Sequence, residues 1–155
     1  TLAARAATDR GVRLSGGVDF EFAGFGSWPG VGDMNGDGLA DLVVGAYNAN
    51  GAAGKTYLVY GKADGTAVNL STIATGSGGF VINGEAASDY SGNSVSSAGD
   101  VNGDGLADLL VSAAWTISHT QAGRNYVVFG KTDSNAINLN SVAAGTGGFV
   151  INGVS

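Results

Sequence analysis

The feature that most constrains this chain is an eleven-residue segment that occurs twice. Residues 32–42 read Gly-Asp-Met-Asn-Gly-Asp-Gly-Leu-Ala-Asp-Leu, and residues 99–109 repeat this order 67 positions later with one change, Met34 to Val101. Self-similarity at a fixed spacing is typical of repeat architectures, in which neighbouring copies of one unit bury each other's faces. The sequence therefore predicts a fold built from repeated units.

Segments outside the two loops repeat as well. Residues 57–62 match residues 126–131, and residues 79–84 match residues 148–153, both at a spacing of 69. Residues 11–16 resemble the segment at 79–84 at an offset of 68. Three copies of one strand-like segment therefore flank two full units.

Each unit consists of short apolar runs rich in β-branched and aromatic residues, bounded by Gly, Asn, Asp and Ser, which is the pattern of strands and turns. No helical periodicity extends far enough to predict a long helix. The expected strands are residues 22–31, 41–46, 55–60, 78–84, 90–98, 108–114, 124–129 and 147–153. We therefore expect an all-β fold in which each repeat is a β-propeller blade of four antiparallel strands.

Two blades do not close a ring, because propellers have about four to eight. The expected organisation is an N-terminal tail or linker at residues 1–10, an extra outer strand at residues 11–19, blade one at residues 20–85 and blade two at residues 86–155. Unpaired blades expose strand edges and apolar faces. Neighbouring blades must then come from the same longer chain or from other copies in a homo-oligomer, such as a trimer with six blades.

The repeated segment has the composition of a calcium-binding loop. Oxygen-bearing side chains stand at its positions 1, 3, 5 and 9, and glycines at positions 4 and 6 permit a tight curl that turns the carbonyl of position 7 inward. Hard cations such as Ca²⁺ take six to eight oxygen ligands. The predicted ligands are Asp33, Asn35, Asp37, Leu39 and Asp41 in the first repeat and Asp100, Asn102, Asp104, Leu106 and Asp108 in the second.

Other interpretations of the same segment remain open. Asn-Gly and Asp-Gly also make hairpin turns without any metal. Magnesium is a weaker candidate, because it demands stricter geometry and dehydrates reluctantly. The spacing resembles the start of an EF-hand, but position 12 is Val44 or Val111 where that motif has a bidentate Glu, and a strand follows instead of a helix.

Composition excludes several classes of function. The net charge is −6 with only seven Lys and Arg, which argues against a nucleic-acid partner. Cysteine is absent, so any metal must be bound by oxygen, and no apolar run is long enough for membrane insertion as a helix. Residues 1–10 lack the apolar stretch of a secretory signal peptide. With a single histidine and its acids at metal spacing, the chain has no catalytic residue set, and we do not expect an enzyme.

The motifs resemble the FG-GAP repeat of integrin α-subunit propellers and of large secreted bacterial repeat proteins. The resemblance covers residues 11–153. Its name-giving segments are Phe25-Gly26 and Gly45-Ala46-Tyr47 in the first repeat, and Ser91-Gly92 and Ser112-Ala113-Ala114 in the second. The Asp-rich loop is the family's most specific signature, and neither copy keeps the final proline.

This resemblance implies a calcium-binding structural or adhesion module of a secreted or cell-surface protein. It also implies that ligand contact, if any, uses the loops at residues 47–54 and 114–123, which differ between the copies. An alternative is therefore a glycan- or protein-binding adhesin with those loops as its rim, and a remote one is a non-catalytic accessory region of a secreted enzyme. The candidate rim residues are Tyr47, Asn48, Asn50, Trp115 and His119.

Overall fold

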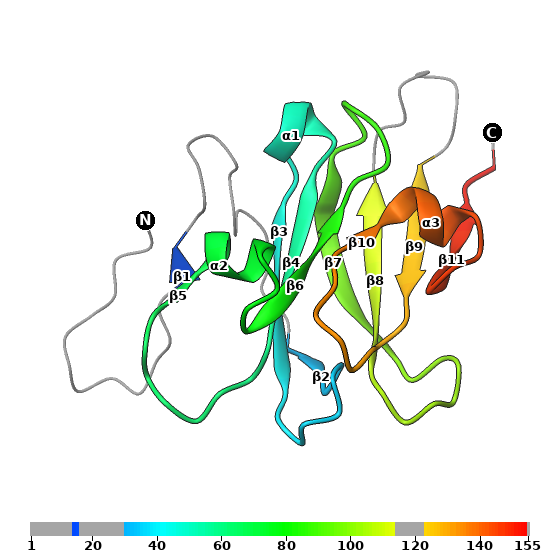
Figure 1. Ribbon diagram of the computed structural model, residues 1–155. Helices are drawn as coiled ribbons and strands as arrows, with labels where there is room; N and C mark the ends of the chain where they lie inside the picture. The colour runs from blue at the N-terminus through cyan, green and yellow to red at the C-terminus, as the bar shows by residue number, and fades with distance from the viewer. Residues whose placement is uncertain (1–13, 16–29, 114–122, 155) are drawn as a thin grey trace.

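The computed structural model describes residues 14–15, 30–113 and 123–154 (Figure 1). Two large sheets dominate it. The first contains β2 (Gly30–Gly32), β3 (Asp41–Ala46), β4 (Lys55–Val59), β6 (Gly79–Asn83) and β10 (Ile137–Asn138), in the order β10-β6-β4-β3-β2. The second contains β7 (Ser91–Gly99), β8 (Asp108–Ala113), β9 (Arg124–Val128) and β11 (Gly148–Asn152), in the order β11-β9-β8-β7. A small third sheet pairs β1 (Leu14–Ser15) with β5 (Val68–Asn69).

The all-β prediction with four antiparallel strands per repeat is confirmed. Each large sheet has four antiparallel strands in chain order, and equivalent residues pair in both, for example Leu42 with Val59 and Leu109 with Val128. The strands begin and end within about two residues of the expected positions. The first expected strand, residues 22–31, lies mostly outside the described residues.

Short elements were not predicted from the sequence. The structure contains two short helices, α2 (Leu70–Ala74) and α3 (Leu139–Ala143), which are too short to show a helical period. The segment α1 (Ala49–Ala52) is not a regular helix, since Asn50 and Gly51 have φ of 54° and 66°. At the start of α2, the Asn69 side chain accepts a hydrogen bond from the Ser71 N–H at 3.0 Å, which caps the helix. None of the helices in the described residues is long and apolar enough to cross a membrane.

The short strands β10 and β5 pair with strands outside their own four-stranded sheets. β10 comes from the second repeat but pairs in parallel with β6 of the first sheet, where Ile137 lies opposite Ile82. β5 pairs in the same way with β1, where Leu14 lies opposite Val68. Leu14–Ser15 therefore occupies the place of an outer strand, as the sequence repeat indicates, while the predicted domain boundaries stay predictions.

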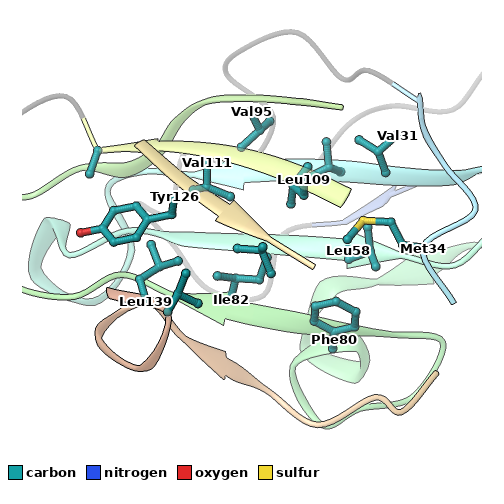
Figure 2. Packing of buried hydrophobic residues seen from close by; sticks show 14 residues of the cluster. Val31, Met34, Leu58, Phe80, Ile82, Val95, Leu109, Val111, Tyr126 and Leu139 are labelled. Carbon is teal, nitrogen blue, oxygen red and sulfur yellow. The ribbon is translucent and has the colours of Figure 1, made fainter. Parts of the chain in front are cut away.

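The buried side chains form two layers. We call the face of each sheet that carries its own short helix the leading face, with α2 on the first sheet and α3 on the second, and the opposite face the trailing face. Along β4, Tyr57 and Val59 point to the leading layer with α2, whereas Leu58 points to the trailing layer. That trailing layer packs against the leading face of the second sheet (Figure 2). The main core therefore lies between the two sheets, and the arrangement is open.

Candidate metal centre

The two Asp-rich segments are equivalent hairpin loops in different sheets. Residues 33–40 join β2 to β3, and residues 100–107 join β7 to β8, at the lower end of both sheets in Figure 1. Most of each loop is exposed, but the final aspartates, Asp41 and Asp108, are fully buried. Each loop thus has an exposed turn and a buried last aspartate.

Asp33, the first aspartate of the loop, holds the turn together by accepting backbone hydrogen bonds. Asp33 Oδ1 accepts hydrogen bonds from the N–H groups of Gly36 at 2.6 Å and Asp37 at 3.1 Å, and Oδ2 accepts one from Gly38 at 2.8 Å. Gly36 and Gly38 have φ of 82° and 87°, a region that favours glycine. The N–H of Gly38 is the main cause of a lowered pKa at Asp33.

The third and fifth residues bond to each other inside this curl. Asn35 Oδ1 accepts a hydrogen bond from the Asp37 N–H at 3.0 Å, and Asn35 Nδ2 donates to Asp37 Oδ2 at 2.9 Å. Asp37 Oδ1 accepts from the Leu39 N–H at 2.8 Å. Three oxygen-bearing side chains therefore gather around one turn of backbone.

The buried aspartate ties the loop to a second turn. Asp41 Oδ2 accepts from the Met34 N–H at 2.8 Å, and Oδ1 accepts from the Gly61 N–H, also at 2.8 Å, at the end of β4. Burial is the largest cause of a raised pKa at Asp41, and the negative charges of Asp37 and Asp33 raise it further. The three carboxylates of the loop therefore share one negative region.

The second loop has the same geometry. Asp100 accepts from the N–H groups of Gly103 at 2.7 Å, Asp104 at 3.1 Å and Gly105 at 2.9 Å. Asp108 accepts from the N–H of Val101 at 2.7 Å and of Gly130 at 2.9 Å. The remaining bonds of the set are those from Asp104 N to Asn102 Oδ1 at 3.0 Å, from Asn102 Nδ2 to Asp104 Oδ2 at 2.9 Å, and from Leu106 N to Asp104 Oδ1 at 2.8 Å. Each distance lies within about 0.1 Å of its counterpart in the first loop.

The donor chemistry of these loops fits a hard cation. Carboxylate and amide oxygens are the ligands that Ca²⁺ takes, and an oxygen that accepts one hydrogen bond keeps a further lone pair. Within the ranges that the structure describes, no three His, Cys, Asp or Glu side chains by themselves stand in metal-binding geometry. The Asn35 side chain and the backbone carbonyl of Leu39 would therefore have to complete a site, as the sequence predicts.

The predicted rim lies at the opposite end of the sheets from these loops, where α1 is found (Figure 1). There Asn50 and Ala52 have φ of 54° and 62°, and the rings of Tyr47 and Tyr90 lie 6.2 Å apart. Trp115 and His119 lie outside the described residues, so the rim is described on one side.

The contact between the two loops was not predicted from the sequence. The carbonyl of Asp33 accepts a hydrogen bond from the Ala107 N–H at 2.9 Å, and the carbonyl of Met34 accepts one from the Lys131 N–H at 2.9 Å. A Cβ at Gly32 would lie 2.9 Å from the Ala107 Cβ, so a side chain there would collide with the second loop. Gly32 was the available signal, because its φ of 84° favours glycine and its lack of a Cβ leaves room for the Ala107 side chain, whereas a Cβ at the equivalent Gly99 would meet nothing within 4 Å.

Comparison with known families agrees with this geometry. The family model described as FG-GAP repeat matches residues 25–59 and residues 91–128. Each matched segment contains one Asp-rich loop with the two strands that follow it. No curated protein matches the chain.

Proposed function

Because this chain carries two FG-GAP repeats, which form β-propeller blades, we propose that it is a calcium-stabilised structural module of a secreted or cell-surface protein. FG-GAP repeats are modules of extracellular and adhesion proteins and are generally non-catalytic. The two blades form an open arrangement, so neighbouring blades complete the propeller.

The observation that carries the calcium proposal is the duplicated geometry of the two loops. A hairpin turn by itself needs two or three special residues, in the order that the turn type demands. Here eight of nine positions are identical, with side-chain oxygens at four of them and the last carboxylate buried in both copies. Such a conserved donor set within one chain supports a ligand in addition to a turn.

Calcium would be held by the side chains of Asp33, Asn35, Asp37 and Asp41 and by the carbonyl of Leu39. In the second loop, the equivalent ligands are Asp100, Asn102, Asp104, Leu106 and Asp108. Bound calcium supplies positive charge and no reaction. Magnesium fits less well, because it keeps its waters and demands octahedral geometry.

The metal would stabilise the joint between blades as well as each loop. The carbonyls of Asp33 and Met34 accept hydrogen bonds from the second blade, so the first loop is part of that joint. A ligand that binds only the folded state stabilises it by about 2.7 kcal/mol when its free concentration is a hundredfold above the dissociation constant. The proposed role of the bound calcium is thus to stabilise the contact between the two blades.

Thermal unfolding in calcium and in excess EGTA tests this proposal. We expect a higher melting temperature in calcium, a smaller increase in magnesium, and loss of part of the calcium effect in Asp37→Ala. Asp64→Ala is the matched control, because Asp64 is an exposed acid outside the loops. Equal melting temperatures in calcium and EGTA would refute the calcium function.

A second candidate function is binding of a glycan or protein at the α1 end. Residues other than glycine at positive φ are rare and cluster at functional loops. Four such residues occur at this end: Asn50, Ala52, Ser88 and Tyr90. They lie close together, since the Tyr90 N–H donates a hydrogen bond to the Ala52 carbonyl at 2.8 Å. A glycan array with wild-type chain, Tyr47→Ala and Trp115→Ala tests the candidate, and a bound glycan that both variants retain would exclude this rim.

A further inference from the structure

One peptide group connects the two Asp-rich loops. It joins Leu106 to Ala107, at positions 7 and 8 of the second loop. Its N–H, from Ala107, donates to the carbonyl of Asp33 in the first loop at 2.9 Å. Its carbonyl, from Leu106, is the backbone oxygen proposed to bind calcium in the second loop. Because a peptide unit is planar and rigid, any turn of this carbonyl also turns the N–H that holds Asp33.

The turn after β9 makes a second connection. The Gly130 N–H donates to Asp108 Oδ1 at 2.9 Å, and the next N–H along the chain, from Lys131, donates to the Met34 carbonyl at 2.9 Å. A Cβ at Gly130 would lie 2.5 Å from the Ala107 oxygen and 3.0 Å from the Met34 oxygen, so this turn fits tightly between the loops. The turn that holds the last proposed ligand of the second loop therefore also holds the first loop.

Side chains pack into the same contact. A Cβ at Gly36 would lie 3.2 Å from the Leu106 Cδ2, and a Cβ at Gly32 would lie 2.9 Å from the Ala107 Cβ. Met34 is fully buried in the core between the two sheets (Figure 2). The second blade therefore holds the first loop at its positions 1, 2 and 4 and at the glycine that precedes it.

The second loop has no such support among the described residues. Val101, which stands where the first loop has Met34, is 49% exposed. A Cβ at Gly103, the fourth position of this loop, would meet nothing within 4 Å. The same difference extends along the sheets, since Phe80 is fully buried and its equivalent Phe149 is 42% exposed. The two loops thus share their local geometry and differ in what holds them from outside.

We propose that the second blade positions the first loop for calcium, and that the two sites therefore bind calcium with positive cooperativity. The positioning groups are the Leu106–Ala107 peptide and the Gly130–Lys131 turn. The inference rests on the proposed calcium function and adds a coupling between the sites, which that function does not require. Because coupling between two binding sites is reciprocal, each site raises the affinity of the other by the same factor.

Ordering of the backbone gives this coupling its sign. A loop whose ligands are held by calcium fluctuates less, so the Ala107 N–H stays in place for Asp33 and the first loop loses less conformational freedom when it binds. Hydrogen-bonded peptide groups also polarise one another, and a carbonyl that shares electron density with a cation leaves its own N–H a stronger donor. Both effects make one site easier to fill once the other is filled.

Electrostatic repulsion acts in the opposite direction. A filled loop is less negative than an empty one, so it attracts the cation of the other loop less strongly. Most of each loop is exposed to solvent, where charges more than about 8 Å apart are largely screened at about 0.15 M salt. We therefore expect the coupling through the joint to dominate at this ionic strength, with a factor of about five or more.

Titration of calcium followed by NMR at this ionic strength tests the proposal. The amide signals of Gly38 and Gly105 each report one loop, because these N–H groups donate to the first aspartate of their own loop at 2.8 and 2.9 Å. The chains compared are the wild type, Asp37→Ala with only the second site intact, and Asp104→Ala with only the first. We expect the product of the two association constants of the wild type to exceed the product of the constants of the two variants by about fivefold or more. A ratio of these products of one or less would overturn the inference.

A matched pair of variants separates coupling through the joint from effects of charge, with the ratio measured in the same three backgrounds. Met34→Ala removes a buried side chain at the joint, keeps every proposed ligand and leaves the charge unchanged, so it should reduce the ratio toward one. Val101→Ala alters the equivalent exposed position and should keep the wild-type ratio. Equal ratios in the two variants would contradict the role of the joint. If Met34→Ala does not fold, Met34→Val, which gives the first loop the sequence of the second, replaces it with the same expectation.

The same titration separates this inference from the calcium proposal. If neither Gly38 nor Gly105 shifts at about 10 mM calcium, well above the range of extracellular modules, the calcium function is wrong and the coupling falls with it. If both loops bind calcium but fill independently, the coupling alone is wrong and the calcium function stands.

Discussion

The buried aspartate that closes each loop should stabilise the protein even without metal. Asp41 is fully buried and accepts two backbone hydrogen bonds at 2.8 Å, one from the start of its own loop and one from the turn after β4. Asp41→Ala leaves the N–H groups of Met34 and Gly61 without this acceptor. Because an unsatisfied buried donor costs about 1–3 kcal/mol, we expect a loss of about 2–4 kcal/mol in the free energy of unfolding.

The measurement is urea or thermal unfolding in excess EGTA, so that loss of a metal ligand cannot contribute. For a chain of this length, the expected decrease in melting temperature is about 5–10 °C. Asp41→Asn keeps one acceptor oxygen and should cost roughly half as much, and Asp108→Ala should behave as Asp41→Ala does. If Asp41→Ala in EGTA unfolds as the wild-type chain does, the two hydrogen bonds do not stabilise the loop as argued.

Other predictions concern the joint between the blades. Gly45→Ala should destabilise the chain strongly or prevent folding in circular dichroism, because its Cβ would lie 2.0 Å from the Gly92 oxygen; normal unfolding of this variant would contradict the close approach. Glu85→Ala should lower stability by about 1–3 kcal/mol in urea titration, since Glu85 accepts hydrogen bonds from Arg124 and from the Tyr126 hydroxyl across the joint. Phe80→Ala should cost about 3–5 kcal/mol, whereas the equivalent change at Phe149 should cost much less in the monomer, and equal losses would show that the trailing faces do not differ.

The strands were predictable because the signal for them is local. A segment such as residues 79–83 reads Gly-Phe-Val-Ile-Asn, and its β-branched and aromatic residues with flanking glycine and asparagine indicate a strand in either copy. The helices α2 and α3 were not predictable, because five residues give one turn and no period. The strands β5 and β10 have two residues each, and their pairing depends on the neighbouring unit.

The candidate site was predictable in part. Spacing alone placed Asp33, Asn35 and Asp37 around one turn, since their hydrogen bonds span five residues or fewer. The hydrogen bond from the Gly61 N–H to Asp41 was not predictable from spacing, because Gly61 lies 20 residues further along the chain. The different exposure of Phe80 and Phe149 could not be predicted either. The two phenylalanines lie in identical sequence segments, and they differ only in the residues that cover them.

The number of calcium ions bound per chain, measured by isothermal titration calorimetry after removal of metal, tests the proposed calcium sites. We expect two Ca²⁺ per chain, with dissociation constants of roughly 10⁻⁴–10⁻³ M, the range of extracellular calcium modules. Asp33→Ala should reduce the stoichiometry to one, and Asp33→Ala with Asp100→Ala should abolish binding. A wild-type chain that is folded but binds no calcium at about 10 mM, well above that range, would contradict the central claim.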